Sequence, residues 1–227
     1  MTESSSTFRN IKLEVNDLTG YSVITNDQLE DSAFDVASIV TDDMRSALLA
    51  KEDREFLVGN GDNGPIGLLY AGAKLSIASR NTTNKIKLAD VIAMEAKLYA
   101  PFHKNAVWIC SQSASAEIAL IQTSVNAMAY SDTLANGGFP MLRGKPVLIS
   151  ENLPSLGTEG DLILVDLSQY FVGSKRDVVI SFSDHYRFLN NETAYRAILR
   201  TDGRNGLNTY LTLANSETVS NIVTIPA

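Results

Sequence analysis

The sequence predicts an α+β protein in which one long helix is followed by a mixed middle section and then by antiparallel strands. Three observations support this class. Apolar residues at helical spacing extend from about Ala33 to Leu57, which is long for a chain of 227 residues. Short apolar runs at residues 106–110 and 162–165 predict buried strands. From residue 177 onward, extended stretches alternate with turn signals, a pattern typical of antiparallel pairing.

The composition is that of an ordinary globular protein. Hydrophobic residues make up 44% and charged residues 20%, so the chain can bury a core. The 19 basic and 26 acidic residues give a net charge of −7, which argues against gripping nucleic acid through a basic surface. A single cysteine excludes an internal disulfide. No apolar run is long enough to span a bilayer and no secretory signal is visible, so no membrane partner is expected.

The amino-terminal part predicts two extended segments and then the long helix. Residues 11–15 alternate between apolar and polar, as a strand with one covered face does. Residues 17–20 (Asp-Leu-Thr-Gly) predict a turn, and residues 21–24 are extended again. Ser32 is the expected cap of the helix at residues 33–57. At 1.5 Å per residue such a helix is roughly 38 Å long, so we expect a rigid beam.

The middle and the tail predict shorter elements. Helices are expected at Leu88–Tyr99, where Pro101 stops the helix, and at 114–122, with a polar irregular segment at 74–84 before them. Expected strands cover 106–110, 145–150, 161–167, 177–182, 187–189, 194–200 and 207–213. Asp202-Gly203 and Asn205-Gly206 are dipeptides typical of tight turns, so they predict a hairpin between the last two strands.

A glycine-dense loop follows the long helix. Gly59, Gly61 and Gly64 match the spacing of a dinucleotide-binding loop. That motif needs a strand before the loop and a helix after it, so that N–H groups point at a pyrophosphate. Here a helix precedes the loop and Pro65 follows the third glycine, so no cofactor is expected. Together with Gly67 these residues predict a structural loop that ends the helix.

No pattern in the sequence predicts a catalytic or metal site. His103 and His185 are the only histidines, and either could in principle serve as a base for a serine or for Cys110. Neither lies in a metal-ligand motif, and no G-x-S-x-G nucleophile turn is present. Both histidines are therefore interpreted as surface or loop residues, and Cys110 as a small core residue.

Two arginines near the end of the chain are candidates for contacts between subunits. Arg196 and Arg200 alternate with apolar residues, so they share one face of a predicted strand. They are either solvated or paired with carboxylates of another subunit.

Several segments, taken in order, resemble one known family. They are Thr7–Val15, Ile24–Ser32, Glu52–Gly61, Gly64–Leu68, Ala106–Cys110, Leu142–Ser150, Leu162–Tyr170, Val178–Phe182, Phe188 and Arg196–Gly203. Their order and spacing are similar to those of the major capsid protein of tailed bacteriophages, with the Hong Kong 97-type capsid fold. The likeness extends over residues 7 to 213.

The resemblance implies a division of the chain. Residues 1–25 would be the remnant of an extended loop, and 26–80 a peripheral domain with the spine helix and the glycine loop. Residues 81–172 would form the axial α/β domain, 173–212 the antiparallel strands of the peripheral domain, and 213–227 a tail that could rejoin the axial domain. The family normally carries an arm and the outgoing half of the loop before this point, so the resemblance implies an amino-terminal truncation.

The resemblance also implies a function without catalysis, metal or cofactor. A major head protein of this family assembles with itself, as pentamers and hexamers, into an icosahedral shell around phage DNA, which it holds without a sequence-specific site. The implied partners are portal, scaffold and protease proteins, and the implied location is the virion after assembly in the host cytoplasm. One alternative is an encapsulin-like nanocompartment that encloses cargo enzymes. A more distant alternative is an α+β hydrolase.

Overall fold

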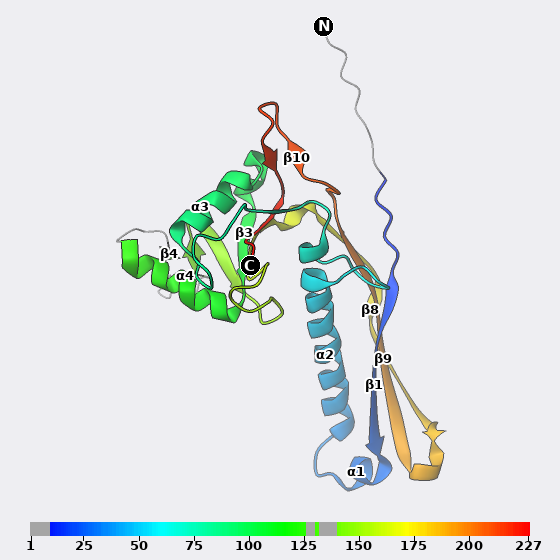
Figure 1. Cartoon of the computed structure of the whole chain (residues 1–227). Helices are drawn as coiled ribbons and strands as arrows, with labels where there is room; N and C mark the ends of the chain where they lie inside the picture. The colour runs from blue at the N-terminus through cyan, green and yellow to red at the C-terminus, as the bar shows by residue number, and fades with distance from the viewer. Residues whose placement is uncertain (1–9, 126–129, 132–139) are drawn as a thin grey trace.

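The fold is that of a computed structural model of the chain, described here for residues 10–125, 130–131 and 140–227, with side chains described outside 122–125 and 130–131. Two bodies lie side by side (Figure 1). One is long and narrow and consists of helix α2 along a three-stranded sheet. The other is rounder and consists of a seven-stranded sheet with helices α3 and α4.

The long body is an antiparallel sheet with a helix on one face. Its strands run in the order β1-β9-β8, with bounds β1 Asn16–Thr25, β8 Tyr170–Arg187 and β9 Glu192–Asn205. The short helix α1 (Asn26–Asp31) leads into α2 (Val36–Val58). The core between helix and sheet contains Met44, Leu48, Tyr195 and Ala197. The helix therefore braces one face of the sheet and leaves the other face uncovered by it.

The long helix confirms the sequence prediction, but its start differs. With 23 residues it is about 35 Å long. The Asp35 side chain caps it by accepting a hydrogen bond from the Ser38 N–H at 3.2 Å. Ser32, the expected cap, instead ends α1 by donating a hydrogen bond from its hydroxyl to the Gln28 carbonyl. The long helix therefore begins three residues later than predicted, and the short helix α1 precedes it.

The prediction for the first strand was wrong in position. Residues 10–15 alternate between partly buried and exposed, as expected, but they pair with no strand. Leu13 packs beside Gly173, and the Glu14 N–H donates to the Asp202 carboxylate at 2.6 Å. The turn predicted at 17–20 lies inside β1. Gly20 faces Leu48 of α2, and a Cβ there would lie 3.7 Å from that side chain, an ordinary contact distance. The glycine is therefore part of a strand and makes no turn.

The prediction of the last hairpin was also wrong. Strand β9 runs straight through Asp202 and Gly203, where the turn was expected, and it pairs with β8 along this stretch. The chain reverses earlier, at a short 3₁₀ turn, Phe188–Asn190, within the segment predicted as a strand. Asn191 completes this reversal in a left-handed conformation with φ 53°.

The rounder body has a mixed sheet in the order β2-β12-β7-β3-β6-β5-β4. The bounds are β2 Lys74–Ser76, β3 Ala106–Cys110, β4 Tyr130–Ser131, β5 Met141–Leu142, β6 Lys145–Ile149, β7 Leu162–Asp166 and β12 Ile222–Thr224. Helices α3 (Leu88–Lys97) and α4 (Gln112–Val125) and the short helices Leu68–Tyr70, Ala100–Lys104 and Leu167–Gln169 complete it, with a small β10 (Leu211–Thr212) and β11 (Thr218–Val219) pair. The predicted strands at 106–110, 145–150 and 161–167 are confirmed; β2 was missed within a polar segment.

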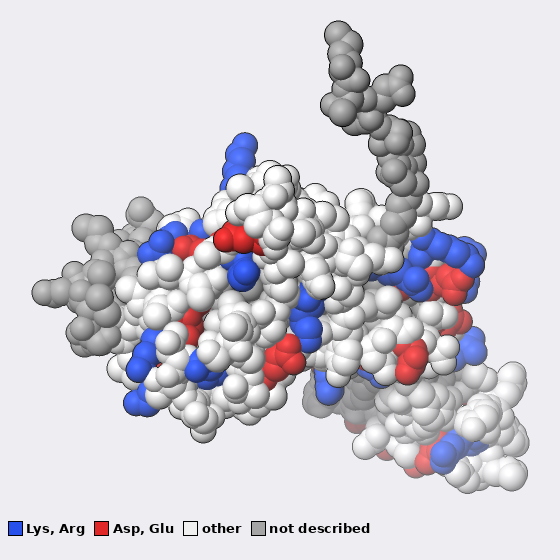
Figure 2. Space-filling model, turned by 45° about the horizontal axis from the view of Figure 1, so that its top comes forward, with Lys and Arg blue, Asp and Glu red and all other residues white. Residues whose placement is uncertain are grey.

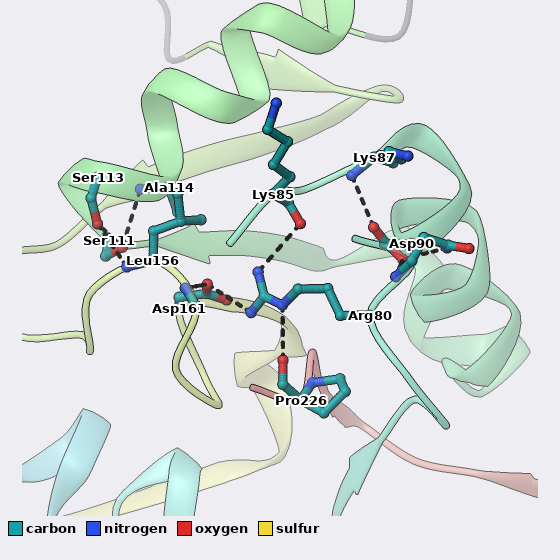
Figure 3. A network of polar contacts seen from close by, with 12 residues as sticks. Arg80, Lys85, Lys87, Asp90, Ser111, Ser113, Ala114, Leu156, Asp161 and Pro226 are labelled. Atoms are coloured by element: carbon teal, nitrogen blue, oxygen red, sulfur yellow. Dashed lines mark hydrogen bonds and ion pairs between the residues drawn. The ribbon is translucent and has the colours of Figure 1, made fainter. Parts of the chain in front are cut away.

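A network of buried polar contacts links the segment after the edge strand β2 to the end of the chain (Figure 3). The Arg80 guanidinium donates to the Asp161 carboxylate at 2.8 Å and to the Pro226 carbonyl at 3.0 Å. The same carboxylate accepts the Gly157 N–H at 2.8 Å. Burial raises the pKa of Asp161, while these hydrogen bonds and the Arg80 charge act in the opposite direction. One side chain thus ties together three segments that are distant in sequence.

Candidate functional site

The glycine loop is compact and follows the end of α2. Gly59 ends the helix, and its carbonyl accepts the Gly67 N–H at 2.8 Å, so the loop closes on itself. Gly61 has a φ of 83°, as the sequence predicts for a helix stop. The Ile66 N–H donates to the Gly203 carbonyl of β9 at 2.8 Å. The loop therefore approaches its own chain closely and joins the end of the helix to the sheet.

Two glycines of this loop provide a matched stability test. A Cβ at Gly67 would lie 2.5 Å from the Gly59 nitrogen and 2.8 Å from the Leu57 carbonyl, both backbone atoms. We expect Gly67→Ala to lower the free energy of unfolding by about 1–3 kcal/mol, because backbone must move. A Cβ at Gly64 would meet no atom within 4 Å. Gly64→Ala should therefore be neutral or stabilising by up to about 1 kcal/mol in urea unfolding, and equal losses for both would contradict the crowding at Gly67.

The residues considered for catalysis do not come together. His103 lies on the short helix after α3, and its Nε2 is 3.2 Å from the Leu98 carbonyl oxygen. His185 lies in β8 with its side chain 90% exposed, and its Nδ1 is 3.5 Å from the carboxylate of its neighbour Asp184. Cys110 is buried in β3, and burial together with the charge of Asp161 raises its pKa to about 12. At neutral pH this thiol is protonated, which makes it a poor nucleophile.

Two hollows lie at the junction of the two bodies. One, of about 820 Å³, contains a surface ion pair in which Lys74 and Glu159 are 2.9 Å apart. The other, of about 420 Å³, is lined mainly by apolar side chains such as Phe56 and Leu148. Neither of these two hollows is lined by a histidine or by Cys110. His103 lines a third hollow, of about 540 Å³, whose described lining contains no serine or cysteine. Within the described ranges, no group of three or more His, Cys, Asp or Glu side chains could hold a metal ion.

The two arginines predicted at subunit contacts lie on the outer face of the sheet, opposite α2, but their surroundings differ. Arg200 forms an ion pair with Asp17 of β1, at 2.6 Å. Arg196 is exposed and has no hydrogen bond or ion pair to any residue that the structure describes. Arg196 is therefore the one of the two with a charge still available to another molecule.

The far end of the long body exposes apolar side chains that the sequence reading missed. Phe182, Tyr186, Phe188 and Leu189 are 76%, 72%, 77% and 96% exposed. An apolar cluster of this kind at the end of a narrow arm is typical of a surface that another molecule covers. The signal was obscured because the reading assigned residues 187–189 to a strand, where apolar side chains are expected to be buried.

On the face drawn in Figure 2, the distribution of charged side chains does not resemble a nucleic-acid interface. Basic and acidic side chains are interspersed there, and most of the visible surface is neither. No helix in the described part of the chain is both long and apolar enough to cross a membrane. A long braced arm with an apolar end, beside a second body, has the form of an assembly subunit.

The sequence comparison defines the family. A sequence model of the phage capsid family matches residues 1–208, and the chain belongs to that family. It is a structural capsid protein, and copies of it form a virion shell. No curated protein sequence matches the chain.

Solved structures share the fold at low sequence identity. The capsid of an empty GTA particle matches with a TM-score of 0.75 and 16% identity, over 100% of this chain and 80% of that one. A protein of Mycobacterium phage Adephagia matches with 0.64 and 13%, over 94% and 72%. The SrpI encapsulin of Synechococcus elongatus PCC 7942 matches with 0.69 and 12%, over 93% and 73%. The predicted Hong Kong 97-like α+β fold is thereby confirmed.

Proposed function

We propose that this chain is the major subunit of an icosahedral head, assembled as pentamers and hexamers around phage DNA. The observation that carries the proposal is the shape of the subunit, a braced arm with an uncovered sheet face and an apolar end, in a chain of the phage capsid family. Such a subunit has large surfaces for copies of itself. Its candidate nucleophile is buried and protonated, which supports a role without catalysis.

The proposal assigns domain roles to the two bodies. The long body, with residues 26–67 and 173–212, would be the peripheral domain, and residues 68–172 with the tail 213–227 the axial domain. Strand β2 pairs with β12 in the seven-stranded sheet, so we place the first boundary before residue 74 and not at residue 80. Residues 1–25 would belong to the extended loop; residues 1–9 lie outside the described part. Portal, scaffold and protease proteins would act with it in the host cytoplasm.

The net charge of −7 supports a shell that encloses DNA without binding it tightly. The test is expression of the full-length product together with its neighbouring genes, followed by electron microscopy of purified particles. We expect icosahedral shells, and DNA inside those made with the packaging genes. Failure of every preparation to yield closed particles would contradict the proposal.

The encapsulin fold of SrpI supports a second candidate, a nanocompartment that encloses protein. The two candidates differ in what purified particles contain. Nuclease-protected DNA supports the phage head, whereas a co-purifying enzyme in particles free of DNA supports the compartment.

A further inference from the structure

The outer face of the three-stranded sheet has a hollow near its far end. Tyr21 of β1 and Ser181 of β8 are both in register with Arg196 of β9, so the three side chains stand side by side on this face. They line a hollow of about 390 Å³ together with Phe182 and Tyr186. The rings of Tyr21 and Tyr186 meet edge to face, with centroids 6.1 Å apart. The hollow therefore combines aromatic walls with one guanidinium group.

This hollow is suited to a ligand that carries both an apolar group and a negative charge. Its tyrosine rings are largely exposed, with Tyr21 at 55% and Tyr186 at 72%. Covering them would remove apolar surface from water. The neighbouring Arg187 is already paired with Glu192 at 3.2 Å, whereas Arg196 has no such partner in the described residues. A carboxylate beside an apolar ring would satisfy both features.

The same end of the molecule carries a complementary knob. Phe34, in the connection between α1 and α2, is 66% exposed and is flanked by Asp31 and Asp35. Residues 26–44 contain six acidic residues and no Lys or Arg. Asp35 caps α2, but Asp31 has no hydrogen bond or ion pair within the described ranges. The knob therefore presents an exposed ring next to a free carboxylate.

Knob and hollow lie on opposite sides of the sheet, so they cannot meet within one chain. The hollow opens on the outer face, whereas α1 and α2 lie on the other side of the long body (Figure 1). Because the chain forms a shell with copies of itself, a second copy is the partner that the knob and the hollow both fit. The opposite charges of Asp31 and Arg196 favour this pairing and fix its orientation.

We propose that the knob of one copy, Phe34 with Asp31, docks in the Tyr21–Tyr186–Arg196 hollow of a neighbouring copy. The Phe34 ring packs against the tyrosine rings, and the Asp31 carboxylate pairs with the Arg196 guanidinium. Such a contact joins two different surfaces, so each copy gives one knob and receives another, and the contacts close into a ring or continue along a row. The contact rests on the proposed self-assembly and names the residues that direct it.

The test is an exchange of charge between the two surfaces in the full chain. Arg196→Glu and Asp31→Arg each place like charges in the contact, so each variant alone should raise the protein concentration needed for assembly by about tenfold or more. The double variant, with both substitutions in one chain, has opposite charges at every contact again. We therefore expect it to assemble near the wild-type concentration. Light scattering and electron microscopy measure assembly of each variant.

Matched controls separate the contact from net charge and from folding. Lys175→Glu and Asp42→Arg make the same charge changes at exposed positions outside the knob and the hollow, and should assemble as the wild type does. Equal weakening by these controls, unchanged assembly of Arg196→Glu, or no rescue in the double variant would each overturn the contact. Another virion protein seated in the hollow would also overturn it. If the wild type itself forms no particles, the proposed function fails; if only the variants behave unexpectedly, the contact alone fails.

Discussion

Replacing Arg80 by alanine is expected to lower the free energy of unfolding by about 3–5 kcal/mol at pH 7, because the Asp161 carboxylate is left buried without its cation. The side chains of Arg80 and Asp161 are 2% and 0% exposed. The substitution also removes the hydrogen bond to the Pro226 carbonyl, which holds the segment after β12. Urea unfolding of the isolated subunit measures the loss.

The loss should depend on pH in a defined direction. Burial raises the folded-state pKa of Asp161 above its unfolded value, so folded protein binds this proton more tightly. Ionisation of such a group as the pH rises lowers stability. Without Arg80 the folded-state pKa rises further. Arg80→Ala should therefore cost least at acid pH, where the carboxyl is protonated in both states, and progressively more as the pH approaches 7.

A surface ion pair in the same body is the control. Lys74 and Glu159 are 2.9 Å apart with side chains 27% and 43% exposed. Lys74→Ala should cost about 0–1 kcal/mol. Adding Asp161→Asn to Arg80→Ala should recover part of the loss, because the uncompensated charge is removed. A loss for Arg80→Ala that is the same at pH 4 and pH 7 would contradict the role assigned to the Asp161 charge.

Truncation of Trp108 should have a comparable effect on the rounder body. Trp108 is fully buried in β3, between β6 and β7, and its Nε1–H donates to the Leu142 carbonyl at 3.1 Å. Trp108→Ala should lower the free energy of unfolding by about 3–5 kcal/mol, through lost contacts and the cavity left behind. Trp108→Phe keeps a ring but leaves that carbonyl without its donor, so we expect a loss of about 1–2 kcal/mol.

The comparison between these two variants identifies the cause. Leu189, which is 96% exposed, provides the reference, since Leu189→Ala should change the stability of the monomer by no more than about 0.5 kcal/mol. Urea unfolding followed by circular dichroism applies to all three variants. Equal losses for Trp108→Phe and Trp108→Ala would show that the hydrogen bond, and not packing volume, dominates at this position.

The parts of the fold that local patterns determine were predictable. The spacing of Val40, Met44 and Leu48 predicts the long helix, and these residues face the sheet core. The apolar run at 106–110 coincides with β3. In both cases the periodicity of the sequence reflects the burial of one element, so no knowledge of its partner was needed.

The errors arose where a distant contact overrides a local signal. Asp202-Gly203 is typical of a turn, yet Gly203 stays in β9 because Tyr170 lies against it, where a Cβ would come 2.4 Å from the hydroxyl oxygen. The Asp202 carboxylate accepts a hydrogen bond from the Glu14 N–H. The Arg80–Asp161 pair joins positions 81 residues apart, which no spacing rule relates.

The proposed assembly surface was only half predictable. Alternation placed Arg196 on one strand face, as the structure has it, but the aromatic partners of Arg196 come from β1 and β8 through strand register. Phe34 falls within residues 33–57, the range predicted for the long helix, yet it lies before the helix starts and is exposed. A single sequence does not distinguish an apolar residue that is buried by its own chain from one that a second chain would cover on assembly.

The position of β12 has a consequence for the order of synthesis. This strand, residues 222–224, lies between β2 and β7 in the seven-stranded sheet. Those two neighbours leave the ribosome long before it does, and without it no strand of the described residues pairs with both of them. A nascent chain interrupted before residue 222 would therefore keep two unpaired sheet edges and an unfinished rounder body. Only polypeptides translated past that point would complete the sheet that a shell subunit needs.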